Sequence, residues 1–316
     1  MQDPSLKPPV SRKVTNQHVV SKVLLSRFTV RRSGSRGSRL TRFDLDHPDW
    51  QSEVSPKVCA NATDFVEHDS AKIEDLWQKT EQYMPKVFAA TEKNVPVTDP
   101  QHLTLLRDFM ALHLVRSYRF KTVHTNALSE ASAKLKVKLL ETHREPLLRL
   151  ALRATGEHLD DKRLDEYAAR MIAESSPAQA HIAGRDFPNS LERMFALAKE
   201  RLQNWYPEII WAPMGHFIIG DSPAITLRWQ GNLMDTATDV QTNVAIDDAK
   251  AMILPLGPRH LLSMGPRSTA ATAELAVVQR MNSWQISNAR KHVFFKPNRH
   301  TADFVRAESS DRRIAD

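Results

Sequence analysis

The residues with the clearest chemical potential lie where an apolar segment runs into an acidic corner. Residues 215–227 read GHFIIGDSPAITL, so one strand-like segment enters Gly-Asp-Ser-Pro and a second one leaves it. A carboxylate and a hydroxyl at the end of a strand can act as a base, a nucleophile or a metal ligand. Asp221 and Ser222 are therefore candidate site residues, Asp221 for the chemistry and Ser222 for binding a substrate.

The sequence around this corner argues against several enzyme classes. Gly-Asp-Ser-Leu esterases carry their nucleophile near the N-terminus and need a downstream Asp-x-x-His, whereas here Pro223 replaces the leucine and no such motif follows. The chain also lacks a Gly-x-Ser-x-Gly elbow, a Gly-rich phosphate loop and a His-Glu-x-x-His zinc motif. No single motif fixes a reaction, so function has to be argued from residues that are far apart in the sequence.

A helix expected from Gln101 onward places a charge on an apolar face. Arg116 continues the stripe made by Leu105, Phe109 and Leu112, because positions three or four apart share one face of a helix. A buried charge needs an oppositely charged partner or a water-filled cavity. Arg116 is thus either half of a structural Arg–carboxylate pair or an anion-binding side chain in a pocket.

Four further polar residues stand at the ends of expected elements or on apolar faces. They are Gln17, His18, Glu81 and Asn282. Glu81 lies between the apolar positions of a helical region expected over 70–93, and Asn282 interrupts the apolar stripe of a helix expected over 271–290. Together with Arg116, Asp221 and Ser222, these residues form either a buried polar network or a shared pocket.

In the pocket interpretation, His18 is the general acid or base, and Asp221 and Glu81 are bases or metal ligands. The substrate is bound by the other polar side chains, Gln17, Arg116, Asn282 and Ser222. No metal motif is present, so the cofactor stays open, and Mg²⁺ or Mn²⁺ are the ions that such carboxylates and an imidazole would hold.

An arginine-rich hairpin is expected over residues 28–45, with its turn at Ser-Gly-Ser-Arg-Gly. Its candidate nucleic-acid-binding side chains are Arg31, Arg32, Arg36 and Arg39. The formal net charge of +7 permits contact with nucleic acid but does not require it. The alternative is a solvated hairpin tip, which the absence of interleaved aromatic residues favours.

The composition indicates a globular protein of a reducing compartment. The 316 residues are 41% hydrophobic and 26% charged, and Cys59 is the one cysteine, which excludes a disulfide framework within the chain. No apolar run approaches the ~20 residues that a membrane helix needs. We therefore expect a cytoplasmic protein without a membrane partner; the oligomeric state stays open.

The pattern of elements predicts an α+β fold. A loose basic arm over 1–15 precedes a single domain over 16–300, and a polar tail follows over 301–316. The domain begins with a short helix over 16–28 and the arginine-rich hairpin. A helical section spans 70–206, and one of its helices is capped by Asp99 and opened by Pro100. A mostly antiparallel sheet with one packing helix spans 207–296.

Several of these blocks resemble the domain-of-unknown-function 4238 family over about residues 15–296. The blocks are Gln17-His18-Val19-Val20 with Leu25 and Phe28, the Glu81 helix, the Arg116 helix end, the Ile-Ile-Gly-Asp-Ser-Pro corner, Leu-Pro-Leu at 254–256, and the Asn282 helix. Ser21 stands where the family has proline, and Gly220 where it has serine. The resemblance implies a common site but supplies no reaction.

Two functions are consistent with the sequence. The first is an enzyme acting on a phosphate-bearing substrate, such as a nuclease or phosphoesterase with nucleic acid as substrate. The second is a non-catalytic protein that binds nucleic acid or another protein and uses the polar residues structurally. Convergence of His18, Arg116 and Asp221 on one open cavity would favour the first.

Overall fold

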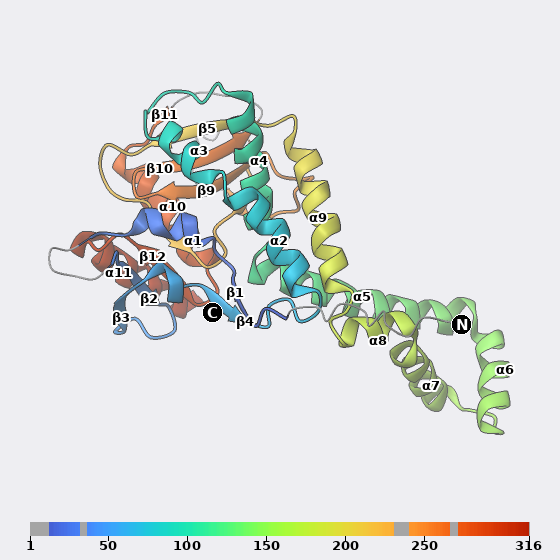
Figure 1. The fold of residues 1–316 in the computed structure, drawn as a ribbon. Helices are drawn as coiled ribbons and strands as arrows, with labels where there is room; N and C mark the ends of the chain where they lie inside the picture. Colours follow the sequence, from blue (N-terminus) through green and yellow to red (C-terminus); the bar gives the residue numbers. More distant parts are fainter. Residues whose placement is uncertain (1–12, 32–36, 231–239, 266–270, 316) are drawn as a thin grey trace, which may run out of the picture.

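The computed structural model describes residues 13–31, 37–230, 240–265 and 271–315 and is an α+β structure, as predicted (Figure 1). A body of sheets and helices carries a helical arm, α5 to α8, on one side. Arg32, Arg36 and the start of the predicted basic arm lie outside the described residues.

The larger sheet has six strands in the order β11-β5-β10-β9-β7-β8. Their bounds are β5 Tyr206–Trp211, β7 Ile225–Arg228, β8 Gln241–Thr242, β9 Ala251–Gly257, β10 His260–Gly265 and β11 Ala271–Thr272. All pairs are antiparallel except β11 with β5. Every residue of β9 is buried, which suits the continuous apolar run of a central strand.

The smaller sheet joins segments from both ends of the chain in the order β3-β2-β12-β6. Its strands are β2 Leu40–Asp44, β3 Gln51–Val54, β6 Ile219–Gly220 and β12 His292–Phe295. β12 lies between β2 and β6, with Phe294 opposite Arg42 on one side and opposite Ile219 on the other. The Gly-Asp-Ser-Pro corner is therefore the end of a strand of this sheet.

The predicted helix over 16–28 is wrong in its first part. Residues Asn16–His18 form strand β1, which pairs antiparallel with β4, Asn61–Thr63. Helix α1 covers only Lys22–Leu25 and continues as a 3₁₀ turn over Ser26–Phe28, and a second 3₁₀ turn covers Pro56–Val58. Adjacent β-branched valines follow β1 and favour extended backbone, and the first of them, Val19, donates its N–H to the Ala60 carbonyl at 2.8 Å.

Four helices of the central section pack against the body. They are α2 Ser70–Glu81, α3 Met84–Thr91, α4 Pro100–Val115 and α9 Phe187–Leu202. Asp99 caps α4 by accepting from the N–H groups of Gln101 and His102, and Pro100 occupies its first turn, as the sequence predicts. These helices share one apolar core with α1 and the central strands, which includes Trp77, Phe109 and Leu254.

The arm has its own small core. It consists of α5 Tyr118–Thr142, α6 Arg144–Thr155, α7 Asp161–Glu174 and α8 Ser176–Ile182. Its buried side chains belong to α6 and α7: Leu147, Ala151, Leu164, Tyr167 and Ala168. No residue of α5 is buried. Together with the view in Figure 1, these packing groups distinguish the arm from the body.

Two helices cover the smaller sheet near the C-terminus. Helix α10 spans Leu275–Asn288 and packs against β6, and α11 spans Arg299–Ala315 and packs against α10. The sequence assigns residues 301–316 to a polar tail, but α11 buries Ala302 and Val305 in a cluster with Phe295. The two apolar positions are three apart and so lie on one face of the helix.

Candidate functional site

Arg116, at the end of α4, is held by carboxylates from α2. Its Nη1 donates to Glu81 Oε1 at 2.5 Å, and its Nη2 lies 4.0 Å from Glu74 Oε2. The guanidinium carbon also lies 4.1 Å from the centre of the Trp77 ring. Arg116 is 2% exposed, so its charge is stabilised by this pairing and stacking within the protein.

His18 lies in the field of the same ion pair. Burial is the largest cause that lowers its pKa, Arg116 lowers it further, and Glu81 and a hydrogen bond with the Pro56 backbone oppose the shift. The imidazole is therefore neutral near pH 7. Among the described residues, its buried Nε2 has no hydrogen-bond partner. His18, Glu81 and Arg116 are thus brought together. Their convergence with Asp221 stays a prediction, because the cavity beside Asp221 is lined by neither His18 nor Arg116.

Gln17 fastens the N-terminal segment to the body. Its Nε2 donates to the carbonyls of Val14 and Val66, and its Oε1 accepts from the Val66 N–H at 2.7 Å. The side chain is 1% exposed. Both the nitrogen and the oxygen of the Gln17 amide are bonded to backbone groups. Its predicted role in substrate binding therefore stays a prediction.

Asp221 turns its carboxylate toward the backbone that leads into β12. Its Oδ1 accepts from the N–H of Arg290 at 2.7 Å, and its Oδ2 accepts from those of Lys291 and His292 at 2.9 and 3.0 Å. Burial raises the pKa of the carboxyl, and the three backbone donors act in the opposite direction. The carboxylate therefore positions residues 290–292.

Asn282 and its neighbour Gln285 connect α10 to the strand that leads into this corner. Asn282 accepts from the Ile218 N–H at 3.0 Å and donates to the His216 carbonyl, while Gln285 accepts from the Gly220 N–H at 2.9 Å and donates to the Pro223 carbonyl. Both amides thus complete backbone hydrogen bonds. Sequence reasoning singled out Asn282 and missed Gln285, although both interrupt the buried face of α10.

The glycine before Asp221 is explained by close packing against α10. A Cβ at Gly220 would lie 3.0 Å from the Gln285 carbonyl oxygen and 3.1 Å from the Ala289 Cβ, so α10 would have to shift by a few tenths of an ångström to accept a side chain. Ser222, the predicted substrate-binding hydroxyl, is buried in the same corner. The corner is therefore packed on the side of α10, and its open side is the one toward residues 290–292.

A basic cavity of about 380 Å³ lies beside Asp221. It is lined by Arg42, Val58, Ala60, Asn61, Tyr118, Asp221, Arg290, Lys291 and His292. Arg42 and His292 come from the paired strands β2 and β12, in a register that places Arg42 opposite Phe294, two residues from His292. Side chains two apart on a strand share a face, so both reach the same side of the sheet.

Two of the arginines of this basic cavity lie over aromatic rings, and two polar atoms of its lining are unpaired within the described part of the chain. The guanidinium carbon of Arg290 lies 4.8 Å from the centre of the Tyr118 ring. The guanidinium carbon of Arg42 lies 5.0 Å from the centre of the Trp50 ring. Among the described residues, the buried Arg42 Nε and Asn61 Oδ1 have no hydrogen-bond partner. The cavity therefore contains one cationic donor, the Arg42 Nε, and one acceptor, the Asn61 Oδ1, that no described residue uses.

His292 is the titratable imidazole of the basic cavity. Burial is the largest cause that lowers its pKa; Asp221 and Asp44 raise it, and Arg42 and Lys291 lower it. The ring is neutral near pH 7 and gains a charge only in more acidic solution. The fixed positive charges of the cavity are those of the two arginines and the lysine.

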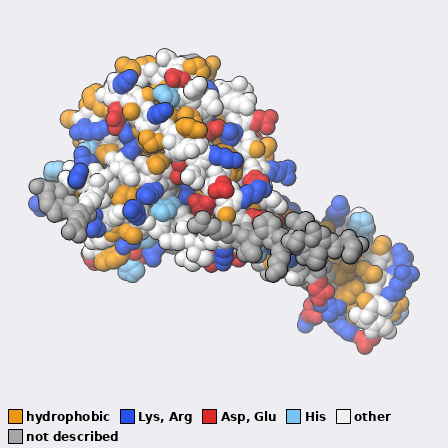
Figure 2. Space-filling model, viewed as in Figure 1, with side chains coloured by type: hydrophobic (Ala, Val, Ile, Leu, Met, Phe, Trp, Pro, Cys, Tyr) orange, Lys and Arg blue, Asp and Glu red, His pale blue; other side chains and the backbone are white. Residues whose placement is uncertain are grey.

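The predicted nucleic-acid-binding arginines are only partly described. Arg31 and Arg39 are exposed, and a bridge between Val30 and Arg39 supports a hairpin at this position. Figure 2 shows Lys and Arg side chains interspersed with Asp and Glu on the face that it presents. On that face the net charge of +7 is not gathered into one basic surface.

The profile of one protein family matches residues 16–299 of the chain. The chain belongs to DUF4238, a family described as proteins of unknown function. The DUF4238 match begins at β1 and ends at the first residue of α11, so it includes all three sheets of the described residues and every predicted site residue. No curated protein and no solved structure matches this DUF4238 chain. Within its described part, no helix is long and apolar enough to cross a membrane.

Proposed function

We propose that this DUF4238 protein binds a small phosphate-bearing ligand in the basic cavity beside Asp221. The observation that carries the proposal is the gathering of Arg42, Arg290, Lys291 and His292 around one cavity. Guanidinium groups bind phosphate oxygens through paired hydrogen bonds, and lysine adds a compact positive charge. The unpaired Nε of Arg42 is a donor of the kind that a phosphate oxygen would accept from.

The size and lining of the basic cavity favour a small molecule over a duplex. Its volume of about 380 Å³ lies toward the lower end of the range for small-molecule sites, ~300–1,000 Å³. The Tyr118 ring borders it, which adds an apolar surface for a base or another flat group. A nucleotide or a similar organic phosphate combines these features.

In this proposal Asp221 is a positioning residue. Both of its oxygens accept backbone N–H groups, so it fixes the segment that carries Arg290, Lys291 and His292. The side chains of these three residues line the cavity while their backbone is held. A pre-ordered segment binds with a smaller loss of conformational entropy.

Hydrolysis of the bound phosphate ester is the second candidate. It is favoured by His18, whose neutral imidazole has an unpartnered Nε2 among the described residues and is near the Arg116–Glu81 pair. Tyr118 of the basic cavity follows Arg116 by two residues, and Asn61 of the cavity is the strand partner of His18. The nucleic-acid alternative rests on the exposed Arg31 and Arg39 alone.

Binding is tested by calorimetric titration with phosphate, pyrophosphate, ADP and a short single-stranded oligonucleotide. We expect ADP or pyrophosphate to bind, and Arg290→Gln and Lys291→Gln to weaken that binding about tenfold or more, because a charged hydrogen bond contributes about 1.5–3 kcal/mol. Neither substitution removes the backbone N–H that Asp221 accepts.

Arg163→Gln is the matched control, since Arg163 lies on the arm and pairs with Glu157 in solvent. It removes the same charge without touching the basic cavity. If no phosphate compound binds, or if the control weakens binding as much as the cavity variants do, the proposal is wrong. Release of phosphate by the wild type and its loss in His18→Gln would add hydrolysis to binding.

A further inference from the structure

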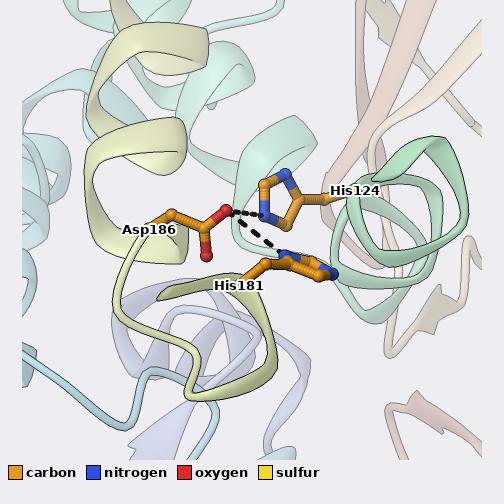
Figure 3. Close-up of side chains that lie close together, drawn as sticks. All are labelled: His124, His181 and Asp186. Atoms are coloured by element: carbon orange, nitrogen blue, oxygen red, sulfur yellow. Dashed lines mark hydrogen bonds and ion pairs between the residues drawn. The ribbon is translucent and has the colours of Figure 1, made fainter. Parts of the chain in front are cut away.

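Three potential metal ligands meet where the arm joins the body. They are His124 on α5, His181 on α8 and Asp186, which directly precedes α9 (Figure 3). Asp186 Oδ2 lies 3.2 Å from His181 Nδ1 and 3.6 Å from His124 Nε2. All three ligand atoms lie within 4.8 Å of one another. None of these residues belongs to the basic cavity or to the Arg116 pair.

Hydrogen bonding within this group leaves acceptors unused. The 3.2 Å contact between His181 and Asp186 is a hydrogen bond, but the 3.6 Å contact of His124 is too long for one. Among the described residues, the buried His124 Nε2 and Asp186 Oδ1 have no hydrogen-bond partner. The His124 nitrogen and the free Asp186 oxygen are therefore acceptors that a cation could use.

Two of the three ligand-to-ligand distances are close to those of tetrahedral coordination, and the third is within 4.8 Å. An ion with bonds of about 2.0–2.2 Å to nitrogen and oxygen holds neighbouring ligand atoms about 3.3–3.6 Å apart. The observed 3.2 and 3.6 Å need only small side-chain shifts to meet this geometry. Two imidazoles and one carboxylate fill three positions of a tetrahedron, and a fourth stays open for water or substrate.

We propose that His124, His181 and Asp186 bind one divalent transition-metal ion, with Zn²⁺ as the best match. Imidazole nitrogens favour Zn²⁺, Co²⁺ and Ni²⁺ over Mg²⁺ and Ca²⁺, which prefer all-oxygen sites. The three residues line a cavity of about 340 Å³, so the fourth position of the ion can be reached from solvent. The proposal does not depend on ligand binding in the basic cavity.

Two phenylalanine rings hold the His124 ligand in place. The His124 ring lies 5.3 Å from Phe187 and is stacked with Phe120 at 6.4 Å, which limits its rotation.

The two other charged groups of this cavity have opposite signs. Glu67 lines the opening and adds a negative charge near the proposed ion. Lys121 also lines it, but its ammonium donates to the Phe65 carbonyl at 2.9 Å and lies 5.6 Å from the centres of the Phe65 and Phe187 rings. The lysine is thus held by its own partners and leaves the three ligands available.

Metal binding is tested on untagged protein treated with a chelator and then titrated with Zn²⁺ against a competing indicator. We expect one Zn²⁺ per chain with a dissociation constant of micromolar or below, and no competition from millimolar Mg²⁺. Cobalt bound at the site should give the intense visible spectrum of tetrahedral coordination. Bound Zn²⁺ should also raise the melting temperature, because it binds the folded state.

His124→Gln, His181→Gln and Asp186→Asn should each weaken Zn²⁺ binding at least about 100-fold, which is the upper range for losing even an indirect partner of a metal. Circular dichroism checks that the variants fold. His158→Gln and His68→Gln are matched controls, since His158 is exposed and His68 contacts the Ala183 carbonyl beside the site. Sub-stoichiometric binding, unchanged binding in the three variants, or equal loss in the controls would overturn the proposal.

Discussion

At the scale of single residues, burial decides the charge of His113, near the end of α4. His113 is fully buried, and desolvation lowers its pKa from 6.5 to about 3. Its Nδ1 bonds to the Phe109 carbonyl at 3.0 Å, so Nε2 is left to accept the Ser21 N–H at 3.3 Å. The neutral ring therefore connects the N-terminal segment to α4, and a protonated ring could no longer accept this bond.

This connection predicts acid sensitivity. Between about pH 6.5 and 3 the unfolded chain holds a proton on His113 that the folded protein excludes, so stability falls as the pH falls. At pH 5, about 1.5 units below the ordinary pKa, His113 lowers the free energy of unfolding by about 2 kcal/mol, since each unit corresponds to about 1.4 kcal/mol. Urea unfolding at pH 7.5 and 5 should show a shallower loss in His113→Gln than in the wild type. An equal pH dependence of both proteins would contradict this role.

Removing the charge of Arg116 should destabilise the protein by about 3 kcal/mol, because the carboxylates of Glu81 and Glu74 lose their buried partner. Urea unfolding of Arg116→Met measures the loss. The double variant Arg116→Met/Glu81→Gln should recover part of it, since the second change removes an unpaired charge. A single variant as stable as the wild type would show that the pair contributes little and would reopen the predicted role of Arg116 in binding an anion.

The sequence predicted which polar residues are buried better than what they contact. Arg116 and Asn282 were found because each interrupts an apolar stripe, and both are buried. Their partners could not be predicted, since Glu81 and the 216–218 backbone are distant in sequence. Arg42 and His292 line one cavity only through the pairing of β2 with β12, for which no local pattern exists.

At the scale of elements, α10 holds the acidic corner through side chains of two residues. Gln285→Leu leaves the Gly220 N–H and the Pro223 carbonyl without their partners, at a cost of about 1–3 kcal/mol for each buried group. We expect a loss of about 3 kcal/mol in urea unfolding. Gln279→Leu on the exposed face of the same helix is the control and should change stability by less than about 0.5 kcal/mol. Similar losses in both variants would exclude this role.

Elements with strong periodicity were predictable, and extended segments beside short helices were not. The α4 helix was predicted with its Asp99 cap because cap chemistry and an apolar period agree there. The 16–28 segment has the same apolar spacing, yet its start pairs with β4, a partner more than 40 positions away. Tertiary pairing overrides a local pattern when the segment is short.

At the scale of the whole molecule, the arm and the body have separate cores. Leu164→Ala should therefore speed amide hydrogen exchange in α6 and α7 while exchange in α4 stays unchanged. Leu106→Ala makes the same change in the core of the body and should lower global stability by about 2–5 kcal/mol. Faster exchange throughout the body of the Leu164 variant would show that the arm and body unfold as one unit.

The smaller sheet has a consequence for the order in which the chain folds during synthesis. Its neighbouring strands β2 and β12 place Phe43 opposite Val293, about 250 positions apart. A ribosome releases β2 about 250 residues before β12, so the apolar face of the early strand lacks this neighbour until those residues have been synthesised. A truncated or stalled chain would expose this strand, and such chains are expected to be targets for chaperones and proteases.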